Sequence, residues 1–239
     1  MNAAACIVFH VPENDQECLY RLENLVYVSK WFLSCGVPVY LYVSGDASQI
    51  SFPPLYSHVI WDAREGFNKP RGYNALAESA AKSHEILLFA ETDNFGSNVT
   101  LACEKALEKG WSPGWYNLAY TSRLSREKIM REYPSHNPRL TLPSYCFGQD
   151  GHEGGLIAFR RDVFHDLQGY DERYTGLGGM DNEIVCRASR IAQPRVIPKL
   201  GMCIHLWHPP SPMKQVRGNL DRLRTLQAAT GRTVWRGEP

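Results

Sequence analysis

Residues 85–94 read EILLFAETDN, and this stretch sets the expected fold. Its first half is a short apolar run with the length of a buried strand, and its second half turns polar at Glu91 and Asp93. Further elements precede it: apolar runs at 5–11, 37–46 and 58–62, and helical patterns at 14–36 and 72–83. This order of strands and helices predicts an α/β fold with a mixed, mostly parallel central sheet flanked by helices.

The second half of the chain continues the pattern less regularly. Residues 112–151 are rich in Pro, Tyr, Ser and Arg, and they indicate a long loop region with short elements. Beyond it we expect a strand at 154–160, helices at 160–169, 180–192 and 213–231, and an extended run at 195–208.

Composition sets the outer limits on function. With 239 residues and 44% hydrophobic content, the chain suits one domain with a real core. The net charge of +1 gives no indication of nucleic-acid binding, and no apolar run approaches the roughly 20 residues of a membrane span. We therefore expect no nucleic-acid partner and at most peripheral membrane contact. The seven cysteines form no CxxC pair and the start is a poor signal peptide, so we expect a cytoplasmic protein with reduced thiols.

Three short motifs suggest chemistry, and each also has a purely structural interpretation. Glu91 and Asp93 would share one face of a strand and could hold a divalent cation that bridges a diphosphate, or they could cap the next helix. His205 and His208 could complete a site for Mn²⁺, or belong to a packed loop. Asp181 follows two glycines and opens an apolar run, so it could be a general base or a helix cap.

The order of these motifs resembles that of the nucleotide-sugar glycosyltransferases of the GT-A fold. The matching pieces are Asp46 after a strand, then RGYNALAESA, LLFAETD, GGLIAFRRDVF, GYDERYTGLGGMDNE and HLWHP. The second half is most similar to galactosyl- and N-acetylgalactosaminyltransferases and to chondroitin-type polymerases. The resemblance covers about residues 5 to 220, and the segment 154–183 followed by HLWHP is its most specific part.

The resemblance implies a role for individual residues. It implies one GT-A domain over 1–239, with a nucleotide-binding half at 1–95 and an acceptor and metal-binding half at 96–239. Asp181 is the expected general base. The expected donor-binding residues are Asp46, Arg71, Asn74, Glu91, Gly154 and Gly155, and the expected ligands of Mn²⁺ or Mg²⁺ are Asp93, His205 and His208.

The implied activity is metal-dependent, inverting transfer of a sugar from a nucleotide-diphosphate donor, with UDP expected, to a hydroxyl of a carbohydrate or glycoconjugate acceptor. Three positions depart from the family pattern: Glu91 replaces an Asp, Met180 replaces a Glu, and Leu177 replaces a Trp. Two alternatives stay open. One is a nucleotidyltransferase that makes the sugar nucleotide, although HVPENDQE lacks the glycines such an enzyme uses to grip a triphosphate. The other is a non-catalytic carbohydrate-binding relative of the same fold.

Overall fold

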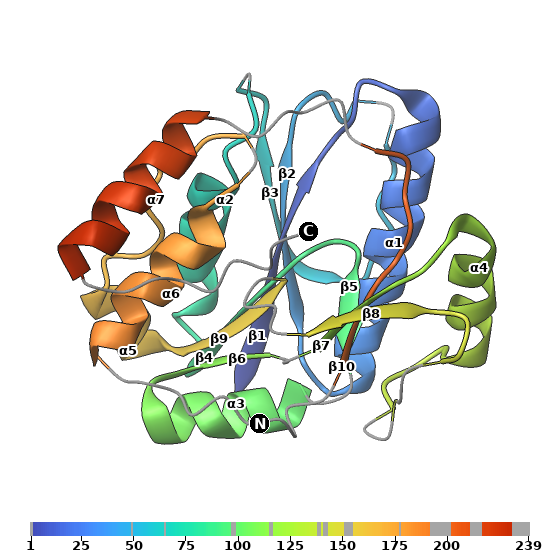
Figure 1. The fold of residues 1–239 in the computed structure, drawn as a ribbon. Coiled ribbons are helices and arrows are strands. Elements are labelled where there is room, and N and C mark those ends of the chain that lie inside the picture. The colour runs from blue at the N-terminus through green and yellow to red at the C-terminus, as the bar shows by residue number, and fades with distance from the viewer. Residues whose placement is uncertain are drawn as a thin grey trace.

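The chain folds around two sheets, as seen in a computed structural model (Figure 1) that describes residues 2–48, 50–64, 66–96, 99–114, 117–137, 140, 143–150, 155–176, 178–191, 202–210 and 217–230. The larger sheet has six strands in the order β3-β2-β1-β4-β9-β6. The first four are parallel, and β9 runs antiparallel to both of its neighbours. The predicted mixed, mostly parallel sheet is therefore confirmed. The strands are β1 (Ala3–His10), β2 (Val39–Ser44), β3 (Tyr56–Asp62), β4 (Ile86–Ala90), β6 (Trp111–Pro113) and β9 (Leu156–Arg160).

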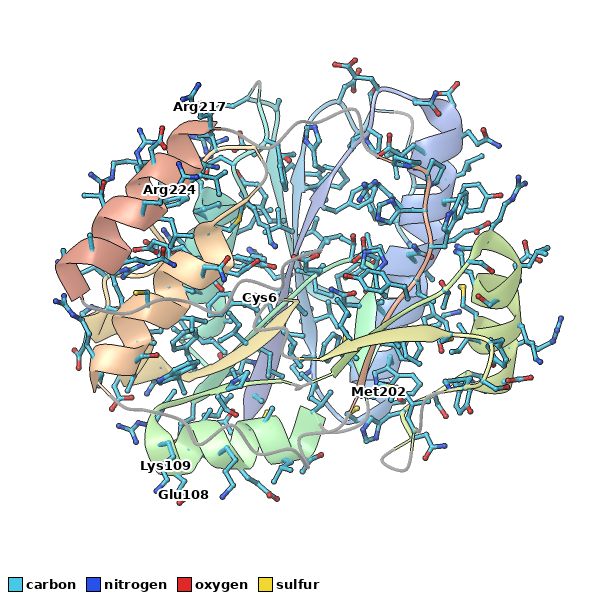
Figure 2. The ribbon with its side chains drawn as sticks, viewed as in Figure 1. Cys6, Glu108, Lys109, Met202, Arg217 and Arg224 are labelled. Carbon is cyan, nitrogen blue, oxygen red and sulfur yellow. The ribbon has the colours of Figure 1, made fainter. Side chains whose placement is uncertain are left out.

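Strand β1 lies in the middle of this sheet and is buried on both faces. Its alternate residues divide the core in two, because successive side chains of a strand point to opposite faces. Ile7 and Phe9 pack on the side that α1 covers, and Cys6 and Val8 pack on the side of α2, α5 and α6. Figure 2 shows Cys6 near the centre of the molecule, while Glu108 and Lys109 lie at its outer edge. The helices are α1 (Asp15–Ser34), α2 (Lys69–Ala80), α3 (Val99–Lys109), α4 (Arg123–Glu132), α5 (Arg161–Asp166), α6 (Met180–Ile191) and α7 (Arg217–Thr230).

The smaller sheet has four strands in the order β5-β10-β7-β8. Strand β10 is antiparallel to β5 and parallel to β7, so it joins a segment near the C-terminus to the segment that follows β4. The strands are β5 (Asn94–Gly96), β7 (Asn117–Tyr120), β8 (Phe147–Asp150) and β10 (Met202–His205). This sheet brings distant parts of the chain side by side, between the larger sheet and helices α1 and α4 (Figure 1).

Helix α2 begins three residues earlier than predicted. The Asn68 side chain accepts the Arg71 N–H at 2.9 Å, and Pro70 has the φ that a first helical turn requires. Gly72, where the predicted helix began, instead lies at the closest approach of α2 to the sheet: a Cβ there would stand 2.7 Å from Val8 Cγ2. The cap therefore places Lys69 at the helix start, beside the end of β4.

The middle of the chain is more ordered than predicted. The expected loop region at 112–151 contains two strands of the smaller sheet and α4, whose Ser122 and Ser125 form a capping box. Helix α3 was not predicted. The strand expected at 85–94 is also shorter, because β4 ends at Ala90 and a turn precedes β5. Within the described part of the chain, no helix is long and apolar enough to cross a membrane.

Candidate functional site

Three of the predicted site residues converge at the turn between β4 and β5. His208 Nε2 lies 3.2 Å from Asp93 Oδ2, and His205 Nε2 lies 3.8 Å from Asp93 Oδ1. One ligand atom from each residue lies within 4.8 Å of the others. We call Asp93, His205 and His208 the imidazole cluster. The structure brings these residues together; their role as metal ligands stays a prediction.

Backbone pairing brings these residues together. His205 is opposite Asn94 in the β10–β5 pair and opposite Tyr120 in the β10–β7 pair. Beyond the strand, the Leu206 N–H donates to the Asp93 carbonyl at 2.7 Å, and the Thr121 N–H donates to the His205 carbonyl at 3.0 Å. These backbone hydrogen bonds fix the HLWH segment, residues 205–208, on both sides.

A second, buried layer supports the HLWH segment from α1. Asn24 Nδ2 donates to the carbonyls of Leu206 and Trp207, at 3.5 and 3.3 Å. Arg126 of α4 donates through Nε to Asn24 Oδ1 at 2.7 Å and pairs with Glu23 at 2.8 Å. The arginine is only 2% exposed, so one of the basic residues of the expected loop region is part of the core. The sequence contains no signal for this network, because the two partners of each of these bonds are 102 or more positions apart in the chain.

The imidazole cluster fits a divalent cation chemically. Burial would raise the pKa of Asp93, but His205, His208 and Arg21 outweigh it and hold the pKa well below its usual range. Burial opposes protonation of His208, yet its hydrogen bond to Asp93 raises the pKa above the ordinary value. Asp93 Oδ1 is buried and has no hydrogen-bond partner. One carboxylate with two imidazoles is a donor set that Mn²⁺ and similar ions accept.

Glu91 and Asp181 belong to a different cluster, built around Lys69. Lys69 Nζ lies 2.5 Å from Glu91 Oε1 and 3.6 Å from Asp181 Oδ2, and 5.5 Å from the centroid of the Tyr73 ring. Burial would lower the pKa of Lys69, but Asp181 and Glu91 outweigh it and raise the pKa well above its ordinary value. We call Lys69, Glu91 and Asp181 the lysine cluster.

The expectation that Glu91 and Asp93 share one face is wrong. That expectation required a strand through residue 93, but β4 ends at Ala90 and the turn rotates the two carboxylates apart. The Glu91 side chain is 31% exposed and the Asp93 side chain 5%. Lys69 was missed by the sequence analysis, although Asn68 and Pro70 form a helix-start signal beside it.

Helix α6 holds Asp181 in its first turn. Glu183, in the same first turn, is buried and binds Arg187 at 2.5 Å. Arg187 donates to the carbonyls of Leu167 and Gly169 at 2.5 and 2.8 Å. These contacts fix α6 against the turn after α5. Asp181 is 25% exposed in its side chain, so it can reach a ligand from this fixed helix.

The glycine pair at 154–155 is described in part. Gly155 has a φ of +87°, a conformation that side chains disfavour, and its carbonyl accepts the Glu91 N–H at 3.1 Å. It thus lies against the lysine cluster. Gly154 and Leu177 fall outside the described residues.

The structure does not gather Asp46, Arg71 and Asn74 into either cluster. Asp46 is exposed and its carboxylate accepts the N–H of Ser48 at 2.9 Å. Asn74 binds both backbone groups of Tyr170, at 2.8 and 2.9 Å, and so fixes the turn before α6. Their roles in donor binding stay predictions.

Arg71 reaches a carboxylate that the sequence analysis passed over. Its Nη2 lies 3.0 Å from Oδ2 of Asp62, the buried last residue of β3. Asp62 also accepts from Arg64 Nε at 2.7 Å and from the Tyr42 hydroxyl, and these bonds hold the pKa of Asp62 well below its usual range against the effect of burial. Its position at a strand end is the same signal that singled out Asp46.

A comparison with protein families gives one match, to part of the chain. The family model described as the N-terminal domain of galactosyltransferase matches residues 139–216, about a third of the chain, including Asp181, His205 and His208. No curated protein matches the sequence.

Solved structures match over nearly the whole chain at low sequence identity. GalNAc-T7 with UDP, GalNAc and Mn²⁺ superposes with a TM-score of 0.51 and 11% identity, over 95% of this chain and 47% of that chain. The catalytic domain of Drosophila β1,4-galactosyltransferase 7 with xylobiose has a TM-score of 0.47 and 17% identity, over 94% of this chain and 80% of that chain. Glucosyl-3-phosphoglycerate synthase from Mycobacterium tuberculosis has a TM-score of 0.43 and 16% identity, over 95% and 80%. The strand order and the superposition on GalNAc-T7 agree that the chain has the GT-A fold, and its segment 139–216 is similar to a galactosyltransferase domain.

Proposed function

We propose that this protein is a glycosyltransferase that moves a sugar from a UDP-sugar to a hydroxyl of a carbohydrate acceptor, with Mn²⁺ as cofactor and with inversion at the anomeric carbon. The observation that carries the proposal is the convergence of Asp93, His205 and His208 at the turn between β4 and β5. GalNAc-T7 was solved with UDP, GalNAc and Mn²⁺, which makes these the first ligands to test.

Asp93, His205 and His208 would hold the cation. When bound, Mn²⁺ neutralises negative charge on the diphosphate leaving group. The buried, unpartnered Oδ1 of Asp93 supports this assignment, because a buried carboxylate oxygen normally has a partner.

Asp181 is proposed as the general base. In the reaction, the acceptor hydroxyl oxygen bonds to the anomeric carbon, the bond from that carbon to the diphosphate oxygen breaks, and the hydroxyl proton passes to Asp181. The nucleoside diphosphate leaves with the bonding electrons. Lys69, 3.6 Å from Asp181 Oδ2, supports this role because a nearby cation stabilises the ionised carboxylate that a base requires.

The test is a screen of nucleotide sugars and simple acceptors with Mn²⁺, in which released nucleoside diphosphate is measured and the product anomer is read by NMR. We expect release that EDTA abolishes and that Asp93→Asn lowers at least ~100-fold, because the metal supplies several kcal/mol of charge stabilisation. Asp221→Asn, an exposed carboxylate on α7, is the matched control. Undiminished turnover after EDTA treatment contradicts the metal assignment. No release from any donor favours the non-catalytic carbohydrate-binding relative.

A further inference from the structure

A guanidinium group stands beside the imidazole cluster. Arg21 of α1 places Nη1 3.9 Å from Asp93 Oδ2, the same oxygen that His208 approaches at 3.2 Å. The Arg21 side chain is 18% exposed, so its charge is only partly screened by water. Neither the family match at 139–216 nor the predicted site residues include it.

Glu17 holds Arg21 in this position. One turn earlier in the same helix, Glu17 Oε1 accepts from Arg21 Nε at 2.7 Å, and the Glu17 side chain is only 5% exposed. Glu17 is itself fixed, since its N–H donates to the helix-capping Asn14 side chain at 3.0 Å. The Nη1 end of the guanidinium therefore points at Asp93 from a rigid support.

This arrangement puts two cations in competition for one carboxylate. A guanidinium keeps its charge at every pH at which the protein folds. A divalent ion bound to Asp93 would lie close to that charge and be repelled by it. A diphosphate changes the balance, because its negative charges can pair with the metal and the guanidinium together.

We propose that Arg21 is a positioning residue that couples metal binding to diphosphate binding at the imidazole cluster. This inference rests on the proposed function. Without nucleotide, Arg21 neutralises Asp93 and keeps the affinity for free metal low. With a nucleoside diphosphate present, Arg21 pairs with a phosphate and Asp93 becomes available to the metal. Coupling of this kind is reciprocal, so the metal strengthens nucleotide binding by the same factor.

The test measures Mn²⁺ binding directly, from the loss of the free-ion EPR signal, with and without UDP. The titrations are run at about pH 8, where most histidines are neutral. We expect Arg21→Met to bind Mn²⁺ alone about 10-fold more tightly than the wild type, within the usual range of coupling effects. The strengthening of Mn²⁺ binding by UDP should fall by a similar factor. Lys30→Met removes one exposed positive charge from the same helix and should leave both values unchanged.

One further variant shows whether a gain in Mn²⁺ affinity comes from the lost guanidinium. Arg21→Met leaves Glu17 without its arginine, so the Glu17→Gln/Arg21→Met double variant is measured beside it. A gain in Mn²⁺ affinity that persists in the double variant comes from the lost guanidinium and not from a freed Glu17. Unchanged or weaker Mn²⁺ binding in both variants overturns the inference. A wild-type protein that binds no Mn²⁺, even with UDP, overturns the proposed function instead.

Discussion

Glu91 and Asp93 are two positions apart in the chain, yet they belong to clusters of different character. Asp93 is buried and faces two imidazoles, whereas Glu91 is partly exposed and pairs with an ammonium group. A neutral imidazole can bind a metal, whereas a lysine whose pKa is raised stays charged and cannot. The imidazole cluster is therefore suited to hold a cation, and the lysine cluster already contains one.

Glu91 and Asp93 form one motif in the sequence, but in the structure they belong to clusters with different tasks. The lysine cluster joins α2, the end of β4 and α6 through one ammonium group, so it holds the carboxylate of Asp181 in a defined place. The imidazole cluster joins β10 to the turn after β4. If the separation is correct, the two clusters respond differently to substitution.

The largest expected effect comes from the lysine cluster. Asp181→Asn should lower kcat/KM for transfer at least ~1000-fold, because an amide cannot accept the hydroxyl proton. Mn²⁺ binding, measured by EPR, should stay within about twofold of the wild type, since the proposed metal ligands belong to the other cluster. Asp166→Asn, an exposed carboxylate on α5, serves as the control for the loss of one charge. Retained transfer would contradict the assignment of Asp181 as the general base. Loss of Mn²⁺ binding would show that the two clusters act as one site.

The members of the imidazole cluster could be predicted from the sequence, and the members of the lysine cluster only in part. Asp93, His205 and His208 are recognisable because carboxylates and imidazoles after strands are metal-ligand chemistry. The resemblance singled out Asp181 and Glu91, but nothing marked Lys69, whose role depends on where α2 starts. Arg21 and Asn24 lie within a helix pattern, and they face the site only because α1 packs against β5 and the segment that follows β10. Such contacts depend on tertiary packing, which local patterns do not record.

The strands, too, could be predicted where a local sequence pattern marks them and not where they depend on tertiary contacts. The strands at the centre of the larger sheet are continuous apolar runs, and the sequence predicted them to within a few residues. Strands β6 and β7 are only three and four residues long, so their apolar pattern is too short to detect. They exist because they pair with β9 and β10.

An intermediate effect is expected from the support of the imidazole cluster. Asn24→Leu removes the amide that binds the carbonyls of Leu206 and Trp207, and it removes the oxygen that accepts from Arg126 Nε. We expect the free energy of unfolding to fall by about 2–3 kcal/mol, because buried polar groups lose their hydrogen bonds. The affinity for Mn²⁺ should fall ~10-fold as HLWH loses its support.

Urea unfolding and Mn²⁺ titration check the two parts of this prediction separately. Gln16→Leu, at an exposed position of the same helix, should change neither value. Transfer chemistry at saturating Mn²⁺ should survive in Asn24→Leu, since the lysine cluster is intact. A variant that keeps full stability and full Mn²⁺ affinity would show that the smaller sheet alone fixes the histidines.

The smallest effect concerns a third carboxylate at the end of the strands, Asp62, which pairs with guanidinium groups instead of imidazole or ammonium. Asp62→Asn should lower the free energy of unfolding by ~1 kcal/mol at pH 7, because Arg64 is exposed and salt-screened while Arg71 is better shielded. The folded-state pKa of Asp62 is depressed, so its stabilisation is present above the ordinary aspartate pKa and is lost as the pH falls through the folded value. Urea unfolding of both proteins should therefore give a difference that shrinks as the pH drops below about 4. If the difference in free energy of unfolding stayed constant with pH, the effect would come from packing. The contribution of Asp62 to stability would then depend little on its charge.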